Sequence, residues 1–225
     1  MKIVNFKLET PKVKLFHFSF FTFYFTLLLL SGCMTFQVGG EIQGGRMALM
    51  YGDPKVALAH FQRAGELDPN YITNFTVFQE GVWTYVGRAN YAAGKFTDAR
   101  QALERALSRY EDDYLARLYL GLLLGRDGDP QRGLKEIEAG LKGLGDWLDY
   151  IDYYTHVGRY WDPTKKIRAE ARRNLAMISG REMNWQELTR NVEWIGEQIE
   201  EEIDRAAKDE REDRLRDSGG SSEQP

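Results

Sequence analysis

The chain has 225 residues, of which 43% are hydrophobic, and a formal net charge of -4. This length and apolar content suffice for one sizeable core or a short solenoid, whereas the acidic balance argues against binding to nucleic acid. The single cysteine and the three histidines exclude a disulfide framework and a cysteine-based zinc site, and they leave few candidates for metal ligation or general base catalysis.

The N-terminal segment has the layout of an export signal. Four lysines lie within residues 1–14, and an uncharged, mostly apolar run follows up to Cys33. The run ends in Leu30-Ser31-Gly32-Cys33, which resembles the lipobox of bacterial lipoproteins. In such signals the cysteine thiol is alkylated with diacylglycerol and cleavage makes that cysteine the N-terminus. We predict a signal peptide over 1–32, a lipid on Cys33 and a tether over 33–40; an uncleaved transmembrane anchor is the alternative.

The residue after the cysteine bears on the destination of such a lipoprotein. It is Met34, and no aspartate stands there. In diderm bacteria this resembles the pattern for export to the outer membrane. The resemblance implies a lipid-anchored protein of the bacterial cell envelope, in the outer membrane and facing the periplasm.

Three segments place small residues at the same offsets from a central glycine. The central glycines are Gly52, Gly94 and Gly128, and each has a small residue seven positions before it, five after it and twelve after it. The last two glycines are 34 residues apart, and the first two are 42 apart, which is the same period with eight residues inserted. Small residues let two antiparallel helices approach closely, and a glycine can end the first helix of a pair. Asp-Pro, typical of a helix start, follows two of these glycines.

This period and pattern resemble the tetratricopeptide repeat, a pair of helices that stacks into a solenoid. The matching residues are Gly45, Ala57, Phe61, Ala64 and Pro69, then Trp83, Val86, Gly87, Ala99 and Ala106, and then Leu120, Gly121 and Ile137. The resemblance covers about 38–147, although the first copy lacks the tryptophan and the other two lack the closing proline. We predict an all-α solenoid over 41–180 with about three repeats followed by degenerate helices; an unrelated helical bundle is the alternative.

Two stretches depart from the repeat pattern. The inserted residues 71–78 are predicted to lengthen the helix before Trp83, with Phe75 and Phe78 on one face for core packing or for a partner. Residues 147–161 are rich in tryptophan and tyrosine and predict a helix that ends near Gly158, followed by a helix that Asp162-Pro163 opens. Aromatic clusters of this kind pack helices together or form a platform for a ligand.

The C-terminal part predicts a long capping helix over 181–216 and a disordered tail over 217–225. Asn184 and Glu187 form the pattern of a capping box. One apolar stripe follows, for docking on the preceding pair or for a coiled contact with another chain. Its members are Leu188, Val192, Ile195, Ile199 and Ile203. The charged residues from Glu200 onward indicate a solvated helix end.

No catalytic motif, phosphate-binding loop or metal-ligand spacing occurs in the sequence, so we predict no enzymatic activity, no cofactor and no metal. The family resemblance implies instead a groove that is lined by the first helix of each pair and binds a protein or peptide partner. The resemblance places five candidate partner-binding residues in that groove, and the arginines among them would suit acidic groups on the partner. They are Arg46, Arg88, Tyr91, Leu122 and Arg126.

We therefore predict a membrane-tethered adaptor, anchored through the lipid on Cys33, that mediates protein–protein interaction in the assembly of an envelope complex and binds no nucleic acid. The alternative is a small-molecule-binding accessory protein of an envelope transport system that uses the aromatic residues 147–161.

Overall fold

The computed structural model describes residues 36–73, 77–180 and 183–219, with side chains up to Arg216. The predicted signal peptide, the lipidation site Cys33, Phe75 and the end of the tail lie outside the described residues. The chain divides into two compact units, residues 1–37 and 38–225, and the structural features discussed below lie in the second unit apart from the first two residues of the first helix.

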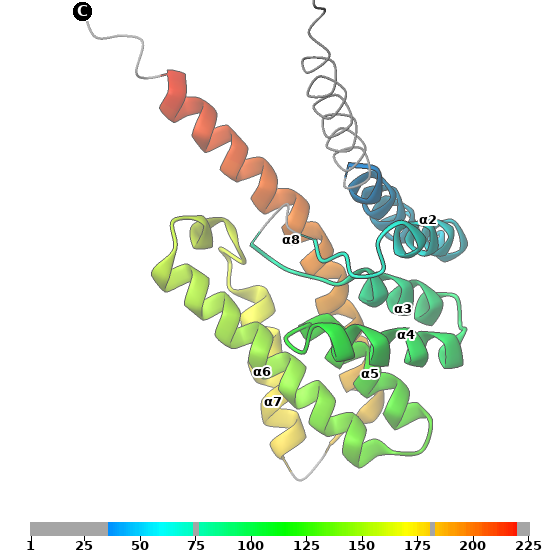
Figure 1. The fold of residues 1–225 in the computed structure, drawn as a ribbon. Coiled ribbons are helices and arrows are strands. Elements are labelled where there is room, and N and C mark those ends of the chain that lie inside the picture. Colours follow the sequence, from blue (N-terminus) through cyan, green and yellow to red (C-terminus); the bar gives the residue numbers. More distant parts are fainter. Residues whose placement is uncertain (1–35, 74–76, 181–182, 220–225) are drawn as a thin grey trace, which may run out of the picture. The chain divides into compact units, whose positions relative to one another are not determined.

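The described part of the second unit consists mainly of helices, and the longest connection, residues 68–81, lies between α2 and α3 (Figure 1). The first helix spans residues 36–50 and is called helix 36–50 below. The elements that follow are α2 (Pro54–Leu67), α3 (Val82–Ala92), α4 (Phe96–Arg109), α5 (Tyr114–Arg126), α6 (Pro130–Tyr154), the 3₁₀ turn η1 (Val157–Tyr160), α7 (Lys166–Ser179) and α8 (Trp185–Gly219). Helix 36–50 pairs with α2, α3 with α4, and α5 with α6, so the predicted all-α repeat fold is confirmed. None of the helices in the described ranges combines the length and the apolar character that a membrane span requires.

The turn within each pair follows the predicted chemistry. Gly52, Gly94 and Gly128 have φ angles of 76°, 73° and 92°, in the left-handed region that L side chains rarely adopt. The Asp53 carboxylate accepts the Val56 backbone N–H at 3.1 Å and begins α2, and Asp129 begins α6 in the same way.

The glycine seven positions before each turn allows the two helices of the pair to touch. A Cβ atom at this position would overlap with a large apolar side chain on the second helix of the pair. The glycine and its neighbour are Gly45 with Phe61, Gly87 with Leu103 and Gly121 with Ile137, and the nearest approaches of the added Cβ would be 2.3, 2.5 and 2.5 Å. The shared spacing of these glycines therefore reflects the close packing of the two helices in each pair.

The inserted segment does not lengthen a helix, so that prediction is wrong. Ile72 and Gly81 form an antiparallel bridge, the Thr73 N–H donates to the Glu80 carbonyl at 2.9 Å, and α3 begins only at Val82. The Val82 N–H also donates to the Tyr71 carbonyl at 2.9 Å, so residues 71–73 pair with residues 80–82 without helical hydrogen bonds. Phe78 is buried in the core, which confirms the packing prediction for this residue.

The third pair also differs from the expectation, because α6 continues through Gly145 to Tyr154 and no separate helix ends near Gly158. The next helix begins at Lys166 rather than at Pro163. Asp162, at a φ of 45°, reaches forward to start this helix, since its carboxylate accepts the N–H groups of Ile167 and Arg168 at 3.1 Å each.

The helix start and the apolar stripe predicted for the C-terminal helix are confirmed. The Asn184 side chain accepts the Glu187 N–H at 3.1 Å, and α8 begins at Trp185. The five apolar residues of the stripe are all buried.

Replacement of Gly121 by alanine tests the packing of the third pair. The new Cβ would lie 2.6 Å from the Gly133 carbonyl oxygen and 2.5 Å from Ile137 Cγ1, so the backbones must move apart. We expect the free energy of unfolding to fall by about 1–3 kcal/mol in urea denaturation.

Gly145→Ala is the matched control, because Gly145 also lies within a helix of this pair and an added Cβ there meets nothing within 4 Å. We expect this variant to be unchanged or stabilised by up to about 1 kcal/mol. Equal destabilisation by the two substitutions would contradict the packing role of Gly121.

Candidate functional site

The long helix α8 lies across the first helices of the pairs (Figure 1). Arg46 on helix 36–50, Arg88 on α3 and Tyr119 on α5 all contact it. In a repeat array of this kind these first helices form the groove for a partner. The protein therefore fills part of its own groove with its C-terminal helix.

Two glycines allow α8 to approach the array closely. A Cβ on Gly196 of α8 would lie 2.4 Å from the Tyr119 hydroxyl, and a Cβ on Gly125 of α5 would overlap with the Trp185 ring. The Arg88 Nη2 group also donates to the Gly196 carbonyl at 3.2 Å. The approach is thus sterically specific at α5, and a hydrogen bond joins α8 to α3.

The carboxylate of Glu200 joins two buried arginines from different repeats. Arg46 Nε donates to Glu200 Oε2 at 2.6 Å, and Arg88 Nη1 donates to Glu200 Oε1. Arg46 is 1% exposed, Arg88 5% and Glu200 3%. Arg88 Nη1 also donates to Glu80 Oε1 at 2.9 Å. Arg46 Nη1 also donates to Asp204 Oδ1 at 3.0 Å, whereas removal of Glu200 would take away the one anion that Arg46 and Arg88 share.

The two carboxylates of this network have opposite pKa shifts. Burial, together with the nearby Glu200 and Asp113, raises the pKa of Glu80 to about 8, although Arg88 opposes the rise. Burial also disfavours ionised Glu200, but Arg88 and Arg46 outweigh this effect and lower the pKa of Glu200 below its usual range. The Glu80 Oε2 atom, the Tyr85 hydroxyl and the Arg88 Nε group have no hydrogen-bond partner among the described residues. At neutral pH Glu200 is the anion of the network and Glu80 is mainly neutral.

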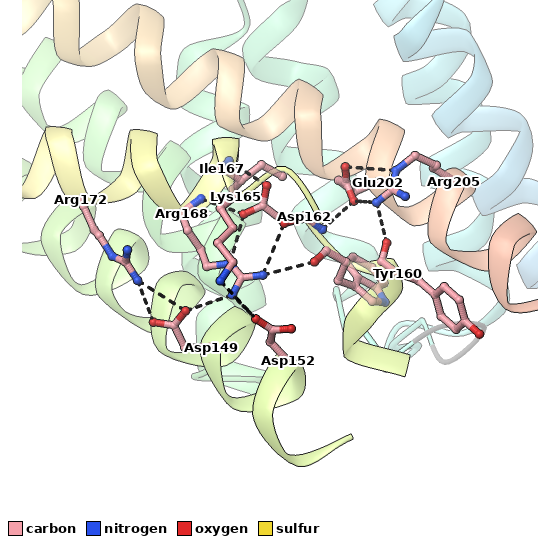
Figure 2. Close-up of polar contacts among 11 residues, drawn as sticks. Asp149, Asp152, Tyr160, Asp162, Lys165, Ile167, Arg168, Arg172, Glu202 and Arg205 are labelled. Atoms are coloured by element: carbon pink, nitrogen blue, oxygen red, sulfur yellow. Dashed lines mark hydrogen bonds and ion pairs between the residues drawn. The ribbon is translucent and has the colours of Figure 1, made fainter. Parts of the chain in front are cut away.

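A second polar cluster, drawn in Figure 2, fixes the end of α6, α7 and α8 together. The guanidinium of Arg168 on α7 is 3% exposed and contacts Asp162 at 3.2 Å, Asp152 at 2.8 Å and Asp149 at 3.2 Å. Glu202 of α8 accepts the Asp162 N–H at 2.9 Å. Each of these polar groups has a partner within the chain, so the cluster stabilises the packing of α6, α7 and α8 against one another.

Two neighbouring cavities open beside α8 on the groove face. The first cavity, of about 600 Å³, is lined by Leu49, Met50, Tyr51, Arg88, Tyr91, Ala92, Tyr119, Glu193, Glu197, Glu200 and Glu201. The second cavity, of about 580 Å³, is lined by Tyr91, Ala92, Gly94, Phe96, Leu122, Gly125, Arg126, Trp185, Thr189 and Glu193. They share three residues, and together they are called the α8 groove below. Such a groove is wide enough for side chains of a bound peptide segment.

The repeat assignment rests on sequence as well as on geometry. Residues 80–123 match the model of the family described as tetratricopeptide repeat. This part of the chain is a tetratricopeptide repeat. The match covers α3, α4 and most of α5, which is the part of the array that carries Arg88 and Tyr91. No curated protein matches the chain. Tetratricopeptide repeats generally mediate protein–protein interaction, and proteins built from them are typically adaptors without enzymatic activity.

The five groove residues expected from the repeat pattern have different positions. Arg46 and Arg88 are buried where α8 packs on the array and Glu200 binds both, and Arg88 also contributes to the lining of the first cavity. Tyr91 is half-buried, lines both cavities and donates to Glu193 at 2.7 Å. Leu122 is buried and lines the second cavity, where exposed Arg126 lies 3.5 Å above the Phe96 ring. Whether these residues bind a partner stays a prediction.

Sequence reasoning missed the glutamates of α8. Glu200 opens a charged run that indicated a solvated helix end, yet this residue is buried. A signal was present, since Glu200 is four residues after Gly196 and three before Ile203, so it continues the buried face of the stripe. Its counter-charges, Arg46 and Arg88, can be identified only from the tertiary structure.

The aromatic residues 147–161 separate into two groups. Trp147 and Trp161 pack edge to face at 5.1 Å and both contact Phe78 in the core. Three tyrosines at the end of α6 are exposed instead: Tyr150, Tyr153 and Tyr154. Neither of the two cavities beside α8 is lined by a residue of this stretch.

Glu200→Gln tests whether one carboxylate holds the network together. The substitution keeps the size of the side chain and leaves Arg46 and Arg88 buried without their shared anion. We expect a loss of about 3–5 kcal/mol in the free energy of unfolding near neutral pH. Glu80→Gln is the control and should change stability by less than about 1 kcal/mol, because Glu80 is mainly neutral there. A larger loss from Glu80→Gln would contradict this assignment of charge.

The pKa of Glu80 also predicts a pH dependence. Its folded pKa of about 8 lies above the ordinary value of 4.5, so the folded protein binds the proton more tightly. The stabilisation is complete below pH 4.5 and is lost as pH rises through about 8.

Urea denaturation at about pH 6 and at about pH 9 measures this effect. We expect wild type to lose stability over this range relative to Glu80→Gln. Glu200 contributes little to the slope, because its pKa is lowered and it stays ionised throughout. Parallel pH profiles for wild type and Glu80→Gln would contradict the prediction.

Proposed function

We propose that this protein is an adaptor that binds a segment of a partner protein in the α8 groove. The observation that carries the proposal is the open space beside α8 on the face that first helices of tetratricopeptide repeats present. Although α8 occupies part of this face, both cavities remain accessible and are lined by side chains from the array and from α8. A partner would therefore contact both at once.

We propose further that a lipid on Cys33 tethers the adaptor to a membrane of the bacterial envelope, at the outer membrane and facing the periplasm. The support lies in the sequence: a basic segment, an apolar run and Leu30-Ser31-Gly32-Cys33 in the order of a lipoprotein signal. Tethering raises the local concentration of a binding groove at the membrane surface, which suits the assembly of an envelope complex.

The tether is tested by Cys33→Ser, which removes the only thiol of the chain. We expect metabolic labelling with palmitate to be lost and the protein to move from the membrane fraction to the soluble fraction. Ser31→Ala is the control, because it keeps a small residue before the cysteine, and it should remain labelled and membrane-bound. Labelling of the Cys33→Ser variant would overturn the lipoprotein assignment.

The groove is tested by photo-crosslinking in cells. A photoreactive amino acid placed at Ala92, which is exposed and lines both cavities, should crosslink to one discrete partner protein. The same amino acid at Gln101, exposed on α4 and lining neither cavity, should not. The proposal fails if both positions give the same products or if Ala92 gives none.

A further inference from the structure

The first cavity has an excess of negative charge. Four glutamates line it, and they follow one another on a single face of α8 at intervals of four, three and one residues. They are Glu193, Glu197, Glu200 and Glu201. The one cation in the lining is Arg88, which already binds Glu80 and Glu200. No positive charge of the lining is left for an incoming anion.

Three of these glutamates remain available to a ligand. Within the described ranges, Glu193, Glu197 and Glu201 take part in no ion pair; Glu193 accepts the Tyr91 hydroxyl and Glu201 accepts the Gln198 amide at 3.0 Å. Glu197 and Glu201 are exposed at the edge of the cavity. Glu193, Glu197 and Glu201 are spaced four residues apart on α8, where like charges repel one another. A cation between them would relieve that repulsion.

The opposite wall of the first cavity is apolar and aromatic. Met50 is 44% exposed and Tyr51 is 81% exposed, although both are large hydrophobic residues. The rings of Tyr91 and Tyr119 complete this wall. Aromatic faces attract ammonium and guanidinium groups, and carboxylates beside them strengthen that preference. An acidic segment would meet repulsion from α8, and the one cation of the lining, Arg88, is already paired with Glu80 and Glu200.

We propose that the α8 groove binds a basic, partly apolar segment of the partner protein, with a lysine or arginine side chain in the first cavity. This inference rests on the proposed function that a partner protein binds in this groove. It reverses the expectation of an acidic partner, because α8 neutralises Arg46 and Arg88 and adds its own carboxylates.

The second cavity determines the apolar character of the segment. Phe96, Leu122 and Trp185 line it, and the Arg126 guanidinium lies over the Phe96 ring. An apolar side chain of the partner fits these surfaces, whereas a second cation beside Arg126 would be repelled. The two cavities share Tyr91, Ala92 and Glu193, so one segment can reach both.

Fluorescence anisotropy with the purified protein tests the proposal. The probe is a short fluorescein-labelled peptide of alternating lysine and leucine, and the comparison is its glutamate–leucine counterpart. We expect the lysine peptide to bind, with an affinity that falls as salt rises, and the glutamate peptide not to bind. The Glu197→Gln, Glu201→Gln double variant should bind the lysine peptide about tenfold more weakly.

The matched control removes two exposed carboxylates elsewhere: Glu138→Gln with Glu212→Gln. It changes the net charge equally and should leave binding unchanged. Spermidine provides a cation without apolar groups, and it should compete poorly. Equal binding of the two peptides, equal weakening by the two double variants, or competition by spermidine as strong as that by the lysine peptide would each overturn the proposal.

The crosslinking experiment separates failure of this inference from failure of the proposed function. If the partner crosslinked at Ala92 is still captured by the Glu197→Gln, Glu201→Gln variant with unchanged affinity, the groove binds a partner but not through a basic segment. If the Ala92 position gives no partner, the adaptor function itself fails, whatever the peptides do.

Discussion

The structure depends on one buried anion. Glu200 is shared by Arg46 and Arg88, which belong to different helix pairs. Where α8 covers these two guanidinium groups, Glu200 supplies their shared counter-charge, because the raised pKa of Glu80 makes it a poor one. Desolvation of two cations is costly, so the array and the C-terminal helix stabilise each other. The α8 helix is therefore part of the repeat domain, although it follows the repeats in sequence.

The same interaction determines what kind of groove remains. By docking on the first helices, α8 covers the arginines that would have made the face positive and contributes Glu193, Glu197 and Glu201 to the opening. The glycines Gly125 and Gly196 make this possible, because a side chain at either position would push α8 away from α5. Specific steric contacts thus place the carboxylates beside the tyrosines of the array, and the groove has a chemistry that neither element has alone.

Local patterns predicted local structure well. The spacing of Gly45, Gly87 and Gly121 predicted close helix pairs because each glycine meets its neighbour within the same pair. The predicted helix bounds were wrong where contacts outside a single helix pair decide the structure. Ile72 forms a bridge with Gly81 in place of helix, and α6 continues past Gly145 because Leu148 and Ile151 pack into the core beyond it. The bridge is not encoded in helical periodicity, whereas the spacing of Leu141, Leu144, Leu148 and Ile151 does carry α6 through Gly145.

The sequence by itself determined the helix pairs, their turns and the buried stripe of α8, because these follow from glycine geometry, capping and apolar spacing over a few residues. Only the tertiary structure decided the electrostatics of the candidate site. Glu200 lies 154 residues from Arg46 and 112 from Arg88 along the chain. A charged residue on a helix can face solvent or pair with a buried counter-ion. The local sequence around it is the same in both cases. The partner of a charge is known only when folding has brought the distant segments together.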